Sequence, residues 1–291
     1  MSDTIASLSR KINSAGNLQS VVRTMKAMAA SSIGQYEKSV SAVGGYFRTI
    51  ELGLGACFRE NPPPSAGSEH KAKLDAAAVV FGSDQGLVGQ FNDVVAEFAI
   101  QSLAAMPGAP LVWAVGERVQ ARLTDAGLTL AGVFPVPSSV AAITPLVGQI
   151  LIEHETHHGR SEVTALHLFY NRPGSGSVYT PVHQRLLPLD DWWCRQLAEL
   201  PWPTKLPPEV MGAGTSTLRA LIREYLFVSL FRACAESLAS ENASRLSAME
   251  RADKNIDELL GNLRGTFHHL RQTGIDEELF DVISGYEALS K

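Results

Sequence analysis

A glycine-rich stretch between an apolar run and a helical pattern is the first place where this sequence could do chemistry. It reads Phe81-Gly-Ser-Asp-Gln-Gly-Leu-Val-Gly-Gln-Phe-Asn92 and follows Ala76-Ala-Ala-Val-Val80. A strand, a glycine-rich turn and a helix in this order can cradle a phosphate at the helix start. Gly82, Gly86 and Gly89 lack the G-x-G-x-x-G spacing, however, and no lysine with Ser or Thr follows the last glycine. A tight strand-to-helix turn, or a contact with another chain, competes with the nucleotide site.

A second candidate is the string His154-Glu-Thr-His-His158, which matches the H-E-x-x-H pattern of zinc peptidases. Its outer histidines would share one helix face as zinc ligands, with the glutamate as general base. The third histidine of the metzincin pattern is missing, because Ser161 stands where its glycine would be. Gly159 instead marks a helix end, where protonated histidines are favoured by the helix dipole. The string therefore predicts a helix terminus rather than a metal centre.

The other candidate side chains form no catalytic arrangement. The tryptophan pair in Asp190-Asp-Trp-Trp-Cys194 precedes a proline-rich segment and indicates packing between domains. Three further histidines have no identifiable partner in the sequence: His183, His268 and His269. Since no nucleophile elbow or paired carboxylates occur, the chain is not expected to be an enzyme on its own or to hold a cofactor or metal.

Bulk composition narrows the class of protein. The chain has 291 residues, of which 45% are hydrophobic and 19% charged, and its formal net charge is -5. These values indicate a globular protein and exclude nucleic acid as the main partner. Cys57, Cys194 and Cys234 are odd in number and widely spaced, which favours a reducing compartment. The start of the chain lacks a signal-peptide pattern, and no stretch approaches the about 20 apolar residues of a membrane span, so a soluble protein is expected.

The elements that would position these side chains begin with a middle block, residues 73–190. Its apolar runs predict buried strands, and helical patterns lie between them, which indicates an α/β domain with a mainly parallel, Rossmann-like sheet. A segment from Val178 to Leu189 is expected to return as an antiparallel edge strand after the turn Arg172-Pro-Gly-Ser-Gly-Ser177. The predicted strands are Ala76–Phe81, Leu111–Val115 and Val163–Tyr170, and the predicted helices are Val94–Ala105, Glu117–Ala126 and Ser139–His157.

Residues 1–60 have the pattern of one long helix. Apolar residues recur at alternating spacings of three and four, which is a heptad seam. Gln19 and Lys26 interrupt this seam and could set its register, and Asn61-Pro-Pro-Pro64 ends the helix. The apolar positions are Ile5, Leu8, Ile12, Ala15, Val22, Ala29, Ile33, Tyr36, Val40, Val43, Phe47, Ile50 and Leu54.

Residues 209–291 repeat this pattern after a linker over residues 191–208. No proline occurs after Pro208, and a helix of about seventy residues would be on the order of 100 Å long. With two such helices, one at each end, an antiparallel coiled coil is the simplest way to bury both seams. The second seam runs through Asn242, Leu246, Met249, Asp253, Ile256, Leu260, Leu263, Phe267 and Leu270.

Three strings of residues match the motifs of a known family. Near the start these are Arg10-Lys-Ile-Asn-Ser14, Asn17, Gln19 and the run from Met25 to Ser31, and in the middle Ser83-Asp-Gln-Gly-Leu-Val-Gly89 with Asn92. The most specific string is Ser240-Glu-Asn-Ala-Ser-Arg-Leu-Ser-Ala-Met249, followed by Asn255, Arg271-Gln272, Ile275, Glu278-Leu279 and Ser284-Gly285. On these motifs the chain resembles the gamma subunit of F-type ATP synthases, the central stalk of a rotary motor.

This chain departs from the family pattern at several positions. Gln85 replaces an arginine and Val88 a cysteine, while Lys26 replaces a glutamate, Ser32 a lysine and Asp276 a threonine. Such drift suggests a divergent paralogue, for example from a second ATPase operon in a bacterium.

The resemblance implies a rotor that is not itself catalytic. Its implied partners are the alpha and beta subunits of the catalytic hexamer, the epsilon subunit and the ring of c subunits, and nucleotides would bind on alpha and beta rather than on the glycine-rich loop. It further implies a peripheral location on the cytoplasmic side of the bacterial inner membrane.

Residue roles follow by position from the same resemblance. Arg271 and Gln272 match a polar pair that contacts a beta-subunit loop, and Met25 matches a methionine in a neighbouring contact. The string Ser240–Met249 is expected to pack the shaft, because Ala243 and Ala248 let helices approach closely. Other shaft-packing residues would be Ile5, Leu8, Ile12, Val22, Leu246, Met249, Ile256, Leu260, Leu263 and Phe267.

Two other functions remain open on the residues alone. A coiled-coil scaffold with an α/β head, unrelated to ATP, would have the same seams. A nucleotide-binding α/β enzyme would instead use the loop at Gly86.

Overall fold

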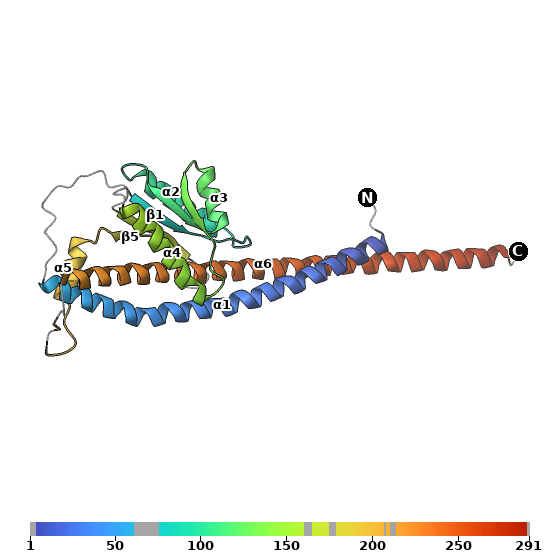
Figure 1. Cartoon of the computed structure of the whole chain (residues 1–291). Helices are drawn as coiled ribbons and strands as arrows, with labels where there is room; N and C mark the ends of the chain where they lie inside the picture. The colour runs from blue at the N-terminus through green and yellow to red at the C-terminus, as the bar shows by residue number, and fades with distance from the viewer. Residues whose placement is uncertain are drawn as a thin grey trace. The chain divides into compact units, whose positions relative to one another are not determined.

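The computed structural model describes residues 4–60, 76–159, 165–174, 179–206, 208–209 and 214–289. The chain forms two compact units: a larger one, Ala30–Arg245, and a smaller one that joins Met1–Ala29 with Leu246–Lys291. Two long helices, α1 (Ile5–Glu60) and α6 (Gly214–Leu289), contribute residues to both units (Figure 1). The predicted four-segment division of the sequence stays a prediction, because the unit boundaries fall within the two long helices rather than between the predicted segments.

The larger unit contains a five-stranded sheet in the order β3-β2-β1-β4-β5. Its first four strands are parallel and β5 pairs antiparallel with β4, which confirms the predicted mainly parallel sheet and its antiparallel edge. The strands are β1 (Ala76–Phe81), β2 (Leu111–Val115), β3 (Leu130–Phe134), β4 (Ala165–Pro173) and β5 (Tyr179–Leu187). Val163 and Val178, predicted within strands, and Ser175 to Ser177 of the predicted turn lie outside the described residues.

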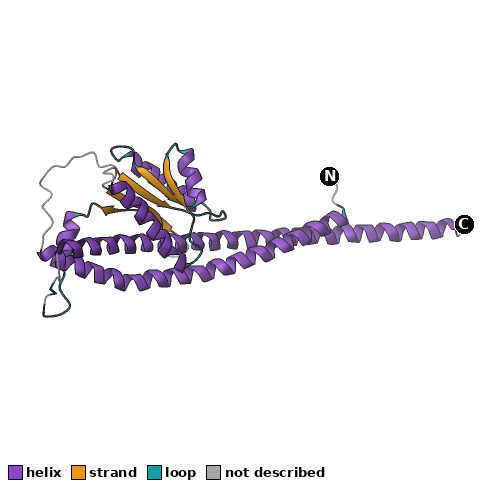
Figure 2. Cartoon of the chain, viewed as in Figure 1, coloured by secondary structure: helices purple, strands orange, loops and turns teal. Residues whose placement is uncertain are grey.

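Helices cover both faces of this sheet (Figure 2). One face packs against α2 (Phe91–Ala104) and α3 (Glu117–Asp125) through a core that includes Val80 and Phe169. The other face packs against α4 (Val140–Gly159) and the larger unit's share of α1 and α6. Because both faces are covered, β1 is buried at all six residues, which explains its continuous apolar run.

Two elements differ from the sequence predictions. Strand β3 was not predicted, because it is a short edge strand whose side chains alternate between half-buried and exposed. The segment expected as a linker contains a helix, α5 (Asp191–Glu199), capped by the Asp190 carboxylate, which accepts from the backbone N–H groups of Trp192 and Trp193. The Trp193 ring lies 4.9 Å from the Tyr225 ring within the larger unit, whereas Trp192 is 69% exposed, so the expected packing of the pair between domains stays a prediction.

Helix α5 lies against the C-terminal end of α1. The Arg59 guanidinium donates to the backbone carbonyls of Ala198, at 2.6 Å, and Leu200. Gly55 faces the same helix, and a Cβ placed there would lie 2.3 Å from the Leu197 carbonyl oxygen. A side chain at this position would therefore push α5 away.

The two long helices pair antiparallel in the larger unit. The Tyr46 hydroxyl donates to Glu224 at 2.7 Å, and the Phe47 and Tyr225 rings lie 6.0 Å apart. A Cβ on Gly53 would be 3.1 Å from Leu221. Residue numbers of the partners therefore fall along α6 as they rise along α1, which is the antiparallel order. Buried residues of α1 in this core include Tyr36, Ile50 and Leu54, all positions of the predicted seam.

The smaller unit buries the rest of the seam. Its core consists of Ala15, Val22, Met249, Ile256 and Leu260, with the partly buried side chains of Ile12, Met25, Ala248 and Ala252 against it. Leu8 is also buried, at 1% exposure, and Leu246, Leu263 and Phe267 are half-buried. Ile5, which was expected in the seam, is 42% exposed, because it is the first residue of α1 and has no preceding helical turn to shield it.

Polar seam positions in this unit find acidic partners on the opposite helix. The Gln19 side-chain amide donates to Asp253 at 3.2 Å, and the Arg23 guanidinium donates to the same carboxylate at 3.1 Å. Lys26 lies 3.6 Å from Glu250. Each pair is satisfied in only one alignment of the helices, so these contacts favour a single antiparallel register.

We expect the seam to carry much of the smaller unit's stability. Leu260→Ala removes a side chain that is 3% exposed and should lower the free energy of unfolding by about 2 kcal/mol or more. Leu259→Ala is the matched control, because Leu259 is 49% exposed on the same helix, and its effect should stay within about 0.5 kcal/mol. Urea unfolding, followed by the circular dichroism of the helices, measures the free energy of unfolding of both variants. Equal losses in the two variants would contradict the burial of Leu260 in the seam.

Gly55 provides a test of the α5 contact. Gly55→Ala should destabilise the chain and increase amide hydrogen exchange in α5, because the new methyl group meets the Leu197 carbonyl. Gly44→Ala in the same helix has open space around its Cβ and should stabilise the helix by about 0.5–1 kcal/mol. Protected α5 amides in Gly55→Ala would show that the contact is not made.

Candidate functional site

The C-terminal part of α6 exposes a concentration of large apolar side chains. They follow the end of the seam and alternate with the carboxylates of Asp276, Glu277, Glu278 and Asp281. In the smaller unit α1 begins at Ile5, and α6 continues past it without a described partner (Figure 1). Contiguous exposed apolar surface marks an interaction site. The residues are Ile275, Leu279, Phe280, Val282, Ile283 and Tyr286, which are between 46% and 74% exposed.

The predicted contact residues lie in different environments. Arg271 and Gln272 are exposed on α6, and neither makes a hydrogen bond or ion pair with another residue that the structure describes. Met25 is half-buried against the core of the smaller unit, so only part of its side chain faces outward. Their contacts with a beta subunit stay a prediction.

The glycine-rich loop lies where ligands often bind in α/β proteins. It follows β1, and the strand order reverses at β1, since β2 and β4 flank it. The carboxyl edge at such a switch point is the common ligand position in open parallel sheets. Topology alone would therefore favour the nucleotide hypothesis.

The side chains of the loop are engaged by the protein itself. The Asp84 carboxylate accepts from the backbone N–H groups of Glu117, at 3.0 Å, and Val136, at 2.9 Å. The Asn92 side chain accepts from the Ser83 backbone N–H at 2.9 Å and donates to the Ser83 hydroxyl at 2.8 Å. These bonds fix the loop to the strand ends, which is a structural use of its polar residues.

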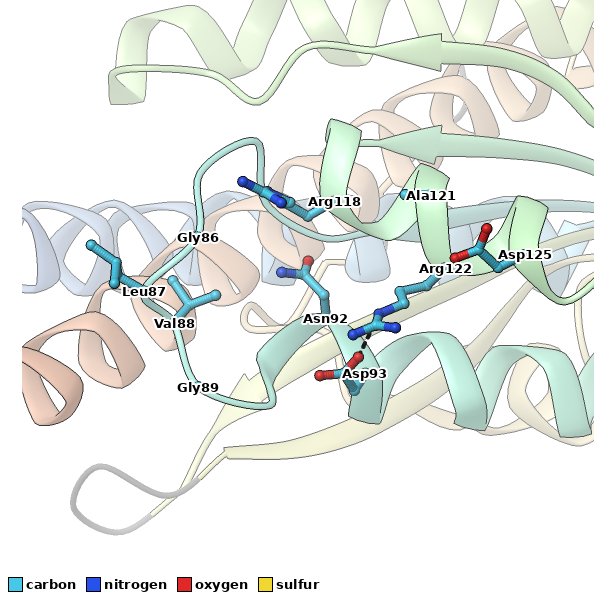
Figure 3. A pocket seen from close by; sticks show the side chains of 10 residues that line it. All are labelled: Gly86, Leu87, Val88, Gly89, Asn92, Asp93, Arg118, Ala121, Arg122 and Asp125. Atoms are coloured by element: carbon cyan, nitrogen blue, oxygen red, sulfur yellow. Dashed lines mark ion pairs between the residues drawn. The ribbon is translucent and has the colours of Figure 1, made fainter.

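A cavity of 730 Å³ lies between the loop and α3 (Figure 3). Its charged lining residues are Arg118, Arg122, Asp93 and Asp125, so their formal charges cancel. Arg122 is further committed to Asp93, at 2.6 Å. A phosphate would meet two carboxylates here, and a balanced lining does not attract it.

Leu87 forms the outer corner of this loop. It has a positive φ of 63° and is 61% exposed, while its neighbour Val88 is buried. A backbone conformation that is costly for leucine is held because Val88 is anchored, so the exposed leucine is presented outward.

The α6 string that matches the family motif anchors the α/β domain. The Ser240 hydroxyl donates to the Asn171 carbonyl of β4 at 3.0 Å, and the Ser244 hydroxyl donates to the Val88 carbonyl of the loop. The role of residues 240–249 in packing the shaft stays a prediction. The hydroxyl groups of these two serines bind the sheet and the loop, and Met249 lies in the core of the smaller unit.

A buried ion pair accompanies these serines. Glu241 and Arg245 lie 2.6 Å apart on successive turns of α6, and both are largely buried. Burial raises the pKa of the Glu241 carboxyl, an effect that Arg245 opposes and the nearby Asp84 charge supports. The Asp84 charge therefore links the loop electrostatically to α6.

The expected base of the H-E-x-x-H string has a partner within the protein. Glu155, the expected base, is bound at 2.7 Å by Arg223 of α6. The side chain of His158 and all of Ser161 lie outside the described part of the chain. Among the residues described, no group of three or more His, Cys, Asp or Glu side chains is arranged to hold a metal ion.

One histidine without a predicted partner has one in the structure. The His183 ring on β5 shares a 2.8 Å hydrogen bond with His167 of β4 and stacks on Phe169. Burial, with His183 and Arg185 nearby, lowers the pKa of His167 to about 4. This pair is neutral at neutral pH and joins the edge strand to the sheet.

Comparison with known proteins identifies the family. A family model described as ATP synthase matches residues 4–289, and the curated relatives that match over nearly the whole chain are ATP synthase gamma chains. The chain belongs to the ATP synthase gamma-chain family. This membership confirms the resemblance seen in the sequence motifs.

Two gamma chains illustrate the distance within the family. The gamma chain of Clavibacter sepedonicus is 27% identical, with 97% of this chain and 96% of that protein covered. The gamma chain of Anaeromyxobacter sp. (strain Fw109-5) is 24% identical, with 98% and 99% covered.

Solved structures of ATP synthases share the fold of this gamma-chain family member. A chain of the Euglena gracilis mitochondrial ATP synthase superimposes with a TM-score of 0.64 at 16% identity, covering 98% of this chain and 94% of its own. A chain of the Tetrahymena thermophila central stalk and c-ring superimposes with a TM-score of 0.57 at 20% identity, covering 80% and 99%. Among the described residues, no helix is long and apolar enough to cross a membrane.

We expect the Asp84 carboxylate to hold the loop in place. Asp84→Ala leaves two backbone N–H groups without their acceptor and should lower the free energy of unfolding by about 1.5–3 kcal/mol. Gln85→Ala, at an exposed neighbouring position, should change it by less than about 0.5 kcal/mol. Thermal unfolding of the full-length variants measures both effects. An Asp84→Ala variant as stable as the wild type would show that this carboxylate does not hold the loop.

Proposed function

We propose that this chain is the central-stalk rotor subunit of an F-type ATP synthase. In this role it couples transmembrane ion flow to ATP synthesis or hydrolysis at the beta subunits by rotation. The observation that carries the proposal is the exposed apolar end of α6, which follows directly on a buried helical seam. A shaft needs a stiff paired segment and an unpaired end that its bearing can enclose.

The chain acts as a coupling element rather than a catalyst. A rotating shaft presents different side chains to three otherwise equal catalytic sites and stabilises a different conformation in each. At 3.6 residues per turn, Ile275, Leu279 and Tyr286 share one face of α6, while the carboxylates of Glu277 and Asp281 fall on the opposite face. This chemical asymmetry lets one orientation of the shaft favour one conformation of a beta subunit.

The exposed Arg271 is proposed to make a transient contact with an acidic residue of a beta subunit. Its guanidinium has no partner within the described chain, and a charge-assisted hydrogen bond to a carboxylate is strong and directional. Gln272 beside it supplies a neutral donor and acceptor. Met25 is proposed to join this contact with its outward-facing part.

Within the larger unit, the hydrogen bonds of Ser240 and Ser244 connect the α/β domain to α6. Force applied to the domain would reach the helix through these bonds and the apolar core around them. We propose that the α/β domain contacts the epsilon subunit and the c ring. We further propose a peripheral location on the cytoplasmic side of a bacterial inner membrane, with nucleotides bound on the alpha and beta subunits.

The assembly is tested by purification from membranes. A tagged full-length chain, solubilised with mild detergent, should copurify with alpha, beta, epsilon and c subunits, which mass spectrometry identifies. Recovery of the chain without any of these subunits would instead favour a free-standing coiled-coil scaffold.

The contact role is tested with Arg271→Ala in assembled membranes. Losing a charge-assisted hydrogen bond of about 1.5–3 kcal/mol should reduce ATP-driven ion pumping by roughly tenfold while the complex still assembles. Arg264→Ala is the matched control, because Arg264 is also exposed on α6 and lies before the unpaired end. Unchanged turnover and pumping in Arg271→Ala would show that this guanidinium makes no productive contact.

A further inference from the structure

A second cavity in the larger unit has a different electrostatic character from the one beside the glycine-rich loop. It measures 290 Å³ and is lined by side chains of α1, β4, β5 and α6. Phe47 and Val182 form apolar walls, and Arg172 and Arg232 supply two guanidinium groups. No acidic residue is among the described residues that line it.

One carboxylate holds the two guanidinium groups together. Each oxygen of Glu236 accepts from a different arginine: Arg172 Nε at 2.9 Å and Arg232 Nε at 2.7 Å. Glu236 is nearly buried, with 6% of its side chain exposed, whereas the arginine side chains are 44% and 45% exposed. The carboxylate therefore fixes the arginines from the interior while their outer ends face the cavity.

The charges of this cluster do not cancel. Two guanidinium groups and one carboxylate leave one positive charge, and the third partner, the Tyr170 hydroxyl, is neutral. Burial and the Glu236 charge raise the pKa of Tyr170, which keeps this phenol protonated. Two like charges beside a partly desolvated cavity repel, and a bound anion would relieve that repulsion.

The arginines retain unused donors. Arg172 uses Nε on Glu236 and Nη2 on Tyr170, and Arg232 uses Nε on Glu236. These bonds leave the remaining Nη groups without a partner among the described residues. A guanidinium with free Nη groups can bind two oxygens of a phosphate or carboxylate.

Ser229 adds a buried hydroxyl to the same lining. It is 4% exposed, and its oxygen makes no hydrogen bond of good geometry in the described chain, although the Tyr225 phenol is close enough to interact with it. A hydroxyl proton can rotate, so the Ser229 hydroxyl can turn from the Tyr225 phenol toward a ligand in the cavity.

We propose that this cavity binds a small oxyanion of the phosphate class. Arg172 and Arg232 would hold its oxygens from two sides, and the Ser229 hydroxyl would donate to a third. Phe47 and Val182 exclude water from the opposite side and strengthen these contacts. The site goes beyond the rotor role and does not depend on it.

The contrast with the first cavity supports this assignment. There Asp93 and Asp125 balance the arginines, whereas here the acidic residue that contacts both arginines, Glu236, is not among the described lining residues and each of its oxygens already accepts from an arginine. Anion binding follows the net charge of the lining, so a phosphate should prefer the cavity at Arg172 and Arg232.

Calorimetry and thermal unfolding of the full-length chain test the proposal. Inorganic phosphate should bind and raise the unfolding midpoint by about 3 °C near saturation, relative to chloride at equal ionic strength. ATP is the second probe. If ATP raises the unfolding midpoint more than phosphate does, and the rise depends on Arg232, the ligand is the phosphate group of a nucleotide. If ATP has an equal or weaker effect, the ligand is free phosphate.

Arg232→Gln should weaken phosphate binding at least about tenfold. Arg223→Gln is the matched control, because Arg223 is 63% exposed on α6 and pairs with Glu155 outside this cavity, and this variant should bind phosphate as the wild type does. Ser229→Ala is a milder variant that keeps the Arg–Glu–Arg cluster, and its affinity for phosphate should fall about threefold.

The proposal is overturned if neither phosphate nor ATP stabilises the wild type more than chloride does. It is equally overturned if the folded Arg232→Gln variant binds phosphate as the wild type does. If Arg232→Gln does not fold, the same result with Ser229→Ala overturns it.

Discussion

The pairing of the two chain ends along an apolar seam is the constraint on which the other features depend. Buried residues from both ends, such as Val22 and Met249, form one core, so neither helix can bury its apolar face alone. The polar residues within the seam give this pairing its direction and register, because Gln19 and Arg23 share the Asp253 carboxylate. A helix of this length gains most of its stability from such packing rather than from intrinsic propensity.

Helix α6 changes its environment along its length, and each change corresponds to a change in residue chemistry. Glu236, Ser240 and Ser244 are polar, and they bond to β4 and to the glycine-rich loop. Met249, Ile256 and Leu260 are apolar because they face α1. Beyond the seam, residues such as Phe280 are apolar without any described neighbour. An exposed apolar surface of this kind marks an interaction site, because contact of apolar side chains with water is unfavourable.

Periodicity predicted the parts of the fold that depend on local pattern. The spacing of three and four gave both seams, and the continuous apolar run Ala76–Phe81 gave the central strand. The bonds from Arg172 to Glu236 and from Ser244 to Val88 could not be predicted, because they join residues far apart in sequence that carry no pattern of their own. Ile5 was misplaced because a periodic pattern does not show where its own helix begins, and no earlier turn of α1 shields that side chain. The family motifs supplied the proposed roles of Arg271 and Gln272, for which no contact within the described parts of the chain gives a reason.

The glycines in the distal part of α6 have a mechanical consequence. Gly261, Gly265 and Gly274 all have open space where a side chain would be, so close packing does not require them. Each lowers helix propensity by about 1 kcal/mol relative to alanine. Helix α6 is therefore easiest to bend or twist over this stretch. A load applied at its C-terminal end would be taken up there as elastic strain before it disturbed the hydrogen bonds of Ser240 and Ser244.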